Sequence, residues 1–203
     1  MVFDAEWEHF YSTNNGNLYP DPAVVRFIAR NYYSVSKRKN IRILDIGCGG
    51  GGSLWYLARE GFSVYGIDGS ELAINKSESI LQKESLVAKL SIGDFSNLPY
   101  EDNYFDAVLD VASVQHNDDD AIKQIVSEVF RVLSPGGKYF SMTIKDDCEL
   151  SSKDFYTNYL SEESIKSIFN CFNNIEINNT KYTEDNRSKY IQFNIITCDK
   201  GSE

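Results

Sequence analysis

Short apolar runs alternate with amphipathic stretches along most of the chain. The runs are rich in isoleucine, leucine, valine and aromatic residues and predict buried strands at residues 41–46, 61–68, 87–92, 104–111 and 138–144. Between the strands, apolar positions recur at helical spacing over residues 54–60, 71–82 and 118–133. Strands and helices in this order predict an α/β domain, with a parallel sheet that carries helices on both faces.

The two ends of the chain depart from this alternation. Residues 1–36 are rich in aromatic side chains, and Asp21 followed by Pro22 indicates the capped start of a helix. We expect this helix to pack on the sheet, whereas residues 7–19 fit a packed segment and an aromatic lid over a substrate equally well. Residues 173–198 carry two strand patterns and predict a C-terminal β-hairpin, which makes one strand antiparallel to the others.

Length and charge narrow the class of protein. At 203 residues the chain is long enough for a three-layer core, and we expect residues 1–203 to form one domain. A net charge of −10 argues against a nucleic-acid partner, which normally meets a basic face, and favours a small-molecule substrate. No apolar stretch reaches transmembrane length, and the first residues lack the features of a signal peptide. We therefore expect no membrane partner and a cytoplasmic location.

The cysteines are scattered and do not suggest a metal site. Cys48, Cys148, Cys171 and Cys198 include no C-x-x-C pair, and two histidines accompany them. We expect reduced thiols and no bound metal, as is usual in the cytosol. Cys48 lies in a glycine turn, where a small packed side chain is expected rather than a nucleophile.

A strand, a glycine turn and a helix follow one another over residues 41–60. This order opens many nucleotide sites, because glycines let the backbone approach a ligand and the helix directs free N–H groups at it. Gly47, Gly49 and Gly52 satisfy the G-x-G-x-x-G spacing of dinucleotide sites. Asp45 changes the interpretation, because its carboxylate would repel a pyrophosphate but suits an ammonium or sulfonium group. The same carboxylate could instead hold the N–H groups of the turn.

The sequence Leu44-Asp45-Ile46-Gly47-Cys48-Gly49-Gly50-Gly51 resembles the first motif of class I S-adenosylmethionine-dependent methyltransferases. Family-like segments follow in the same order as far as Phe140, and residues 130–140 resemble the approach to the family's fifth strand. The resemblance implies a three-layer α/β sandwich around a mostly parallel sheet of seven strands, with the last strand antiparallel. It also implies S-adenosyl-L-methionine as cofactor, S-adenosyl-L-homocysteine as product, and residues 41–144 as the cofactor-binding core.

Acidic residues end several of the predicted strands, where ligands bind in open α/β sheets. Asp68 can accept hydrogen bonds from both ribose hydroxyls, and the family keeps an acid at this position. In the family, the acid that matches Asp94 meets the adenine amino group, and the residue that matches Phe95 packs against the ring. The simpler alternatives are a helix cap for Asp68, a turn for Asp94 and a core position for Phe95. The expected cofactor-binding residues are Asp45, Gly47, Cys48, Gly49, Gly51, Asp68, Gly69, Asp94, Phe95, Asp110 and Val111.

Two residues after the fourth strand are candidates for proton chemistry. The backbone around Asp110 could hold the amino-acid end of the cofactor, and its side chain could face a substrate amine or hydroxyl. His116 could take a proton from a hydroxyl nucleophile, or could be a packing or capping residue. The insert at residues 145–160 forms either a substrate wall or an exposed loop. The expected substrate contacts are Tyr11, Tyr19, His116 and Tyr156.

The sequence therefore predicts a methyltransferase that acts on an oxygen or nitrogen nucleophile of a small metabolite. One alternative is a nicotinamide-dependent oxidoreductase with the same glycine pattern, against which Asp45, Asp94 and the antiparallel tail argue. A second alternative is a non-catalytic methyltransferase-like binding protein, against which the intact glycine turn and its acids argue. The substrate and the oligomeric state stay open.

Overall fold

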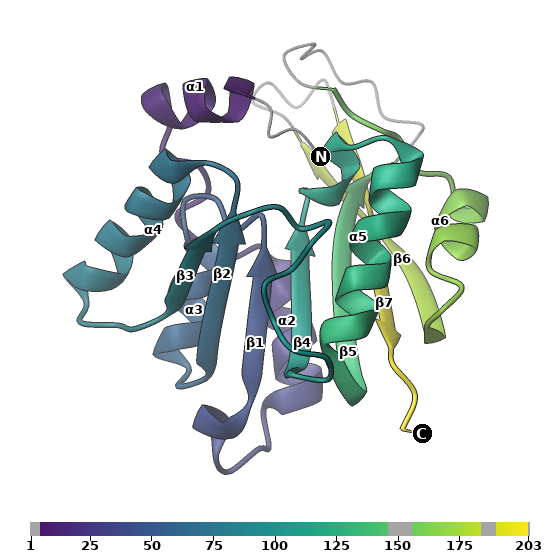
Figure 1. The fold of residues 1–203 in the computed structure, drawn as a ribbon, viewed down its shortest axis with the longest axis horizontal. Helices are drawn as coiled ribbons and strands as arrows, with labels where there is room; N and C mark the ends of the chain where they lie inside the picture. Colours follow the sequence, from purple (N-terminus) through teal and green to yellow (C-terminus); the bar gives the residue numbers. More distant parts are fainter. Residues whose placement is uncertain (1–4, 146–155, 184–189, 203) are drawn as a thin grey trace.

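The computed structural model describes residues 5–145, 156–183 and 190–202. These residues build a seven-stranded sheet with the strand order β3-β2-β1-β4-β5-β7-β6 (Figure 1). The strands are β1 Arg42–Ile46, β2 Ser63–Asp68, β3 Lys89–Ile92, β4 Phe105–Val111, β5 Leu133–Ile144, β6 Asn173–Thr183 and β7 Tyr190–Asp199. Strands β1 to β5 pair in parallel, and β7 is antiparallel to both β5 and β6. The predicted α/β fold with an antiparallel last strand is confirmed.

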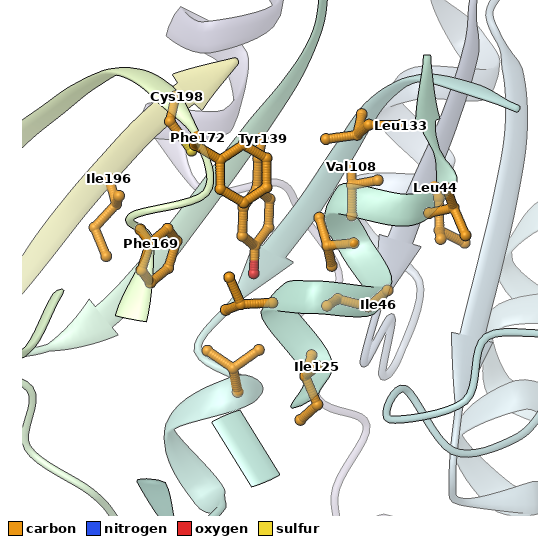
Figure 2. Packing of buried hydrophobic residues seen from close by; sticks show 14 of the residues in the cluster. Leu44, Ile46, Val108, Ile125, Leu133, Tyr139, Phe169, Phe172, Ile196 and Cys198 are labelled. Carbon is orange, nitrogen blue, oxygen red and sulfur yellow. The ribbon is translucent and has the colours of Figure 1, made fainter. Parts of the chain in front are cut away.

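Helices cover both faces of the sheet, which is the middle of three layers (Figure 1). They are α1 Ala5–Thr13, α2 Pro22–Tyr32, α3 Gly52–Arg59, α4 Glu71–Lys83, α5 Asp119–Val132 and α6 Glu162–Ile168, with the 3-10 turns η1 Arg38–Asn40 and η2 Val114–His116. One buried cluster joins the sheet to α5 and α6, and another joins it to α2, α3 and α4. Figure 2 shows the first cluster, where the ring of Tyr139 stacks on Phe169 with centroids 5.6 Å apart.

The predicted helix starts have a local cause. Asp21, Ser70 and Asp118 each precede a helix, and each side chain accepts a hydrogen bond from a backbone N–H of the first turn. These N–H groups have no partner inside the helix, so the caps stabilise α2, α4 and α5 at the expected positions. Because α4 and α5 each follow a strand of the sheet, their first turns lie at its carboxyl edge.

Strand β5 begins earlier than predicted. Phe105 of β4 pairs with Leu133, but Ala107 pairs with Lys138, so the register shifts between the two pairs. Residues 134–137 therefore form a bulge inside β5, whereas we expected the strand to begin at residue 138.

The expectations about membrane segments, cysteines and the 145–160 insert involve residues inside and outside the described part of the chain. None of the described helices has the length and apolar character needed to span a bilayer. Cys48 and Cys198 are buried free thiols and Cys171 is an exposed one. Cys148, most of the 145–160 insert and the connection between β6 and β7 lie outside the described residues.

Candidate active site

A cavity of about 730 Å³ opens at the edge of the sheet where β1, β2 and β4 end. Helix α1 and the loop after it line one side, and the glycine turn and the end of β2 line another. The loop after β4 and the start of α5 complete the wall. The cavity therefore lies where an open α/β sheet binds its ligand.

The turn between β1 and α3 has no room for side chains at its glycines. Gly47 and Gly49 have φ values of +64° and +54°, which glycine adopts without strain. A Cβ on Gly47 would lie 2.2 Å from Ser113 Oγ, and one on Gly49 would lie 2.5 Å from the Tyr11 hydroxyl. The glycines therefore allow Ser113 and Tyr11 to close against the turn at the cavity wall.

Asp68 connects this turn to the start of α4. Its Oδ2 accepts a hydrogen bond from the Gly49 N–H and its Oδ1 accepts one from the Ser70 N–H, both at 2.9 Å. Each carboxylate oxygen has a second lone pair, so Asp68 can accept further bonds at the cavity. Burial raises the pKa of Asp68, and the bonds from Ser70 and Gly49 oppose that rise.

Asp45, Asp68 and Asp110 lie at or near the carboxyl ends of three adjacent strands, and all three carboxylates are buried. Burial raises the pKa of Asp45 well above its ordinary value, and the neighbouring charges of Asp110 and Asp68 raise it further. Burial also raises the pKa of Asp110, to about 6. A positively charged ligand above these residues would relieve their repulsion, whereas an anion would add to it.

Asp110 supports the loop after β4. Its Oδ1 accepts hydrogen bonds from the N–H groups of Ser113 (2.9 Å) and Val114 (3.2 Å), and its Oδ2 accepts one from Ser141 Oγ (2.6 Å). The side chain has no exposed surface and does not line the cavity. The carboxylate therefore holds the cavity wall from behind.

His116 lies in that wall, against the ring of Trp7 with centroids 4.8 Å apart. Its Nδ1 is 2.8 Å from the Tyr156 carbonyl oxygen. Because a carbonyl only accepts, Nδ1 carries the ring proton and Nε2 of the neutral ring has the lone pair. Burial lowers the pKa of His116 below its ordinary value of 6.5, although hydrogen bonds with the Tyr156 and Ala112 carbonyls oppose this, so the neutral form predominates at pH 7.

Helix α1 is tied to the cavity by a carboxylate. Glu8 accepts hydrogen bonds from Ser70 Oγ at 2.5 Å and from the Leu72 N–H at 3.3 Å, at the start of α4. Figure 1 shows α1 beyond the carboxyl ends of the strands, beside α4. Trp7 and Tyr11 of the same helix line the cavity. The helix thus covers part of the site, and its role as a lid stays a prediction.

Solved structures share this fold. A SAM-dependent methyltransferase from Methanosarcina mazei has a TM-score of 0.74 at 23% identity, over 92% of this chain and 100% of that chain. Phosphoethanolamine N-methyltransferase 2 of Haemonchus contortus, in complex with S-adenosyl-L-methionine, has a TM-score of 0.72 at 20% identity, over 97% of this chain and 56% of that chain. At these identities the similarity concerns the fold.

Sequence comparison decides the family. A family model for a methyltransferase domain matches residues 43–137, and a sterol 24-C-methyltransferase from Schizosaccharomyces pombe is 32% identical over 163 residues, or 74% of this chain. The matched residues form a methyltransferase domain of the class I S-adenosylmethionine-dependent type. Norajmaline N-methyltransferase from Rauvolfia serpentina is 35% identical over 109 residues, or 52% of this chain. The chain spans 41% of the length of the S. pombe relative and 37% of the R. serpentina relative.

The site of this methyltransferase fits S-adenosylmethionine, the cofactor of its family. The cofactor carries a positive sulfonium and an ammonium group, which the buried acids below the cavity favour. Asp68 has acceptor positions for ribose hydroxyls, and the glycine turn admits a close ligand. A dinucleotide would instead bring a pyrophosphate toward these carboxylates.

Many of the predicted site residues meet at the cavity, although their individual roles stay predictions. Those that line it are Tyr11, Gly47, Asp68, Gly69, Phe95, Val111, His116 and Tyr156. Gly49 and Gly51 build the turn, while Asp45 and Cys48 are buried and absent from the lining. Asp94 accepts hydrogen bonds from the Ser96 N–H and Oγ, both at 2.8 Å, as in its turn alternative.

Two predicted residues do not have the expected positions. The side chain of Asp110 is buried behind the cavity wall and does not face a substrate amine or hydroxyl, because the loop after β4 folds back onto its carboxylate. Tyr19 is 74% exposed and packs against Trp55 at 5.7 Å between centroids, outside the cavity lining. Neither side chain is part of the cavity lining.

The sequence did not single out several residues of the wall. Trp7 and Phe10 belonged to the aromatic N-terminal segment, but nothing marked them individually. Ala112 lines the cavity with a φ of +60°, a strained value for a residue with a side chain. Asn117 and Asp118 lie just before α5, where the sequence predicted the start of a helix but not its place beside the cavity.

Replacing Gly50 by alanine is expected to weaken cofactor binding by displacing the segment after α1. An added Cβ would lie 2.2 Å from the Asn15 carbonyl oxygen, and both groups are backbone-bound and cannot rotate away. Overpacking of this kind costs about 1 to 3 kcal/mol. Where that cost falls on the cofactor-bound form, Kd rises by roughly 5- to 150-fold. Calorimetric titration with S-adenosylhomocysteine measures the change.

Gly61→Ala is the matched control for that substitution. Gly61 has a φ of +86°, but no atom lies within 4 Å of an added Cβ. The alanine should therefore lower the Tm through backbone strain and leave the Kd unchanged. Equal losses of affinity in both variants would contradict a specific effect of the N-terminal segment.

Proposed function

We propose that this methyltransferase transfers a methyl group from S-adenosylmethionine to an oxygen or nitrogen atom of an uncharged or cationic small molecule. When bound, S-adenosylmethionine supplies a methyl group that is already activated. The protein then has to hold an acceptor atom in line with the methyl group and exclude water, and the aromatic rings of Trp7, Phe10 and Tyr11 in the cavity lining help to exclude it.

The charge of the site is the observation that carries the proposed acceptor class. Asp68 and Asp118 line the cavity, and Asp45 and Asp110 are buried behind its wall. Among the described residues of the lining, none is a lysine or an arginine. A phosphate or carboxylate on the acceptor would therefore lack a cationic partner there and meet a negative potential.

The aromatic wall of the cavity also supports an uncharged or cationic methyl acceptor. Trp7, Phe10 and Tyr156 line the cavity on the side of His116. Aromatic faces bind apolar rings, and they also bind cationic amines through their negative quadrupole. Both kinds of acceptor are compatible with the acidic site.

His116 supports an acceptor with a hydroxyl group. Its ring is neutral at pH 7, and Nε2 has the lone pair. An acceptor hydroxyl next to it would give its proton to Nε2 as the oxygen takes the methyl group, and the proton would then pass to solvent. An amine acceptor also has to lose a proton, but a weaker base is sufficient for it.

The test is methyl transfer from labelled S-adenosylmethionine to matched pairs of acceptors. Each pair contains a neutral alcohol, phenol or amine and its phosphate ester or carboxylate derivative. We expect label only in the neutral or cationic members, and transfer confined to the anionic members would contradict the proposed acceptor class. Cofactor binding without transfer to any member would favour the non-catalytic alternative.

A further inference from the structure

A second cavity, of about 660 Å³, lies on the face of the sheet that carries α2, opposite α5 and α6 (Figure 1). Helix α2 forms one wall, and residues of β5, β7 and β6 form the rest of the lining. Among the described residues, its lining shares none with the candidate active site. Its volume is typical of small-molecule sites. The second cavity is therefore a separate site of suitable size for a ligand.

Three cationic side chains meet at this cavity. Alternate residues of a strand face the same side of a sheet, and Phe140 of β5 packs with the residues of α2. Lys138, two residues before Phe140, is therefore on that face and lines the cavity. Arg26 and Arg30 of α2 are one helical turn apart, so they share one side of the helix, and both line the cavity. The cavity thus receives positive charge from α2 and from β5.

The three cations are not neutralised by partners within the protein. The side chains of Arg26, Arg30 and Lys138 form no ion pair or hydrogen bond with any described residue. The whole chain has a net charge of −10, so a group of unpaired cations is unusual on its surface. A guanidinium group matches the geometry of a phosphate, with two parallel hydrogen bonds. This side of the cavity therefore suits a phosphate group.

The other side of the cavity suits hydroxyl groups. Two carboxylates, those of Glu176 on β6 and Asp199 on β7, line it. Asp199 Oδ2 accepts a hydrogen bond from Asn174 Nδ2 at 2.8 Å, and the carboxylate has further lone pairs for ligand hydroxyls. The remaining polar groups of the lining are amides and hydroxyls, which both donate and accept: Asn31, Asn174, Asn178, Asn179, Thr180, Tyr182 and Thr197. The carboxylates would repel a second anionic group, so the cavity favours one phosphate on a neutral polar body over an acidic peptide.

We propose that the second cavity binds a sugar phosphate. Arg26, Arg30 and Lys138 hold the phosphate, and Glu176 and Asp199 accept hydrogen bonds from the sugar hydroxyls. The ligand is bound without a chemical step. The inference therefore does not rest on the proposed methyl transfer.

The first test is calorimetric titration with glucose 6-phosphate, glucose 1-phosphate, fructose 6-phosphate and ribose 5-phosphate. The parent sugars and inorganic phosphate are titrated as controls. We expect at least one sugar phosphate to bind roughly tenfold or more tightly than both its parent sugar and inorganic phosphate, because hydrogen bonds to charged groups are the stronger ones. If no member of the set reaches this difference, the inference is wrong.

The second test removes one positive charge from the α2 wall. Arg30→Gln is expected to raise the Kd of the bound sugar phosphate by roughly tenfold, because it removes a charged donor to the phosphate. Lys39→Gln is the matched control, because it removes the same charge at an exposed position outside the lining and should leave the Kd unchanged. Arg30 is itself exposed, so neither substitution disturbs the core. Equal Kd values in Arg30→Gln and the parent would overturn the assignment.

The third test locates the ligand in the unmodified protein by NMR of the backbone amides. We expect the sugar phosphate to shift the signals of α2 and β7. Shifts confined to the glycine turn after β1 and the loop after β4 would place the ligand in the candidate active site and overturn the inference. None of these measurements uses a cofactor or a methyl acceptor, so a protein that methylates nothing could still bind the sugar phosphate.

Discussion

Replacing His116 by alanine is expected to lower kcat/KM for a hydroxyl acceptor by roughly 100-fold or more, because a positioned general base contributes at least that much. Burial lowers the pKa of His116 below 6.5, so the active neutral form predominates above that pKa. In the parent enzyme kcat/KM should therefore fall as the pH drops through a value below 6.5. The variant should lose this acidic limb, and rates measured across the pH range show both effects.

Two controls separate proton transfer from packing in that experiment. His116→Ala also removes the ring that meets Trp7, so cofactor affinity is measured alongside the rate. Added imidazole should restore part of the rate if the lost group is a base. His9→Ala removes the chain's other histidine, on an exposed part of α1, and should leave the pH profile unchanged. A parental rate and profile in His116→Ala would rule out the base role.

Replacing Asp68 by alanine is expected to raise the Kd for S-adenosylhomocysteine by roughly a hundredfold. The substitution removes the carboxylate that we assign to the ribose hydroxyls, and hydrogen bonds to a charged group contribute about 1.5 to 3 kcal/mol each. A net loss of about 3 kcal/mol corresponds to a factor of more than 100. Calorimetric titration measures the Kd directly.

Asp68→Asn distinguishes ribose binding from support of the turn. Asp68 also accepts bonds from the N–H groups of Gly49 and Ser70, so alanine removes two internal contacts as well. Asparagine keeps the size and one acceptor oxygen, and its Kd should lie between those of the parent and the alanine variant. An unchanged Kd in Asp68→Ala would contradict the ribose assignment.

The sequence predicted the central sheet well because its signals there are local. The glycine turn after β1, the end of β2 at Asp68 and the cap Asp21 before Pro22 each combine an apolar run with a residue type that few other positions require. Such signals need no knowledge of distant contacts. The total of seven strands followed from the family resemblance rather than from any single segment, and the order of the strands was not predicted.

The features that the sequence did not predict depend on distant contacts. Helix α1 is held by Glu8, whose partners Ser70 and Leu72 are more than sixty positions away in the chain. Asp110 turns away from the cavity because Ser141 of β5 and the loop after β4 bond to its carboxylate. Neither arrangement leaves a periodic pattern in the sequence. The side chain of Gln115, next to His116, is likewise held by a distant residue, because its Oε1 accepts a hydrogen bond from the Ile144 N–H of β5.

The chemistry proposed for the site requires that the cavity binds S-adenosylmethionine and not a dinucleotide. The most direct test is calorimetric titration of the protein with S-adenosylhomocysteine, and with NADH as the control. We predict saturable binding of S-adenosylhomocysteine and none of NADH, because the carboxylates of Asp45, Asp68 and Asp110 favour a cationic ligand and repel a pyrophosphate. Binding of NADH together with no binding of S-adenosylhomocysteine would contradict the assignment of this cavity to S-adenosylmethionine.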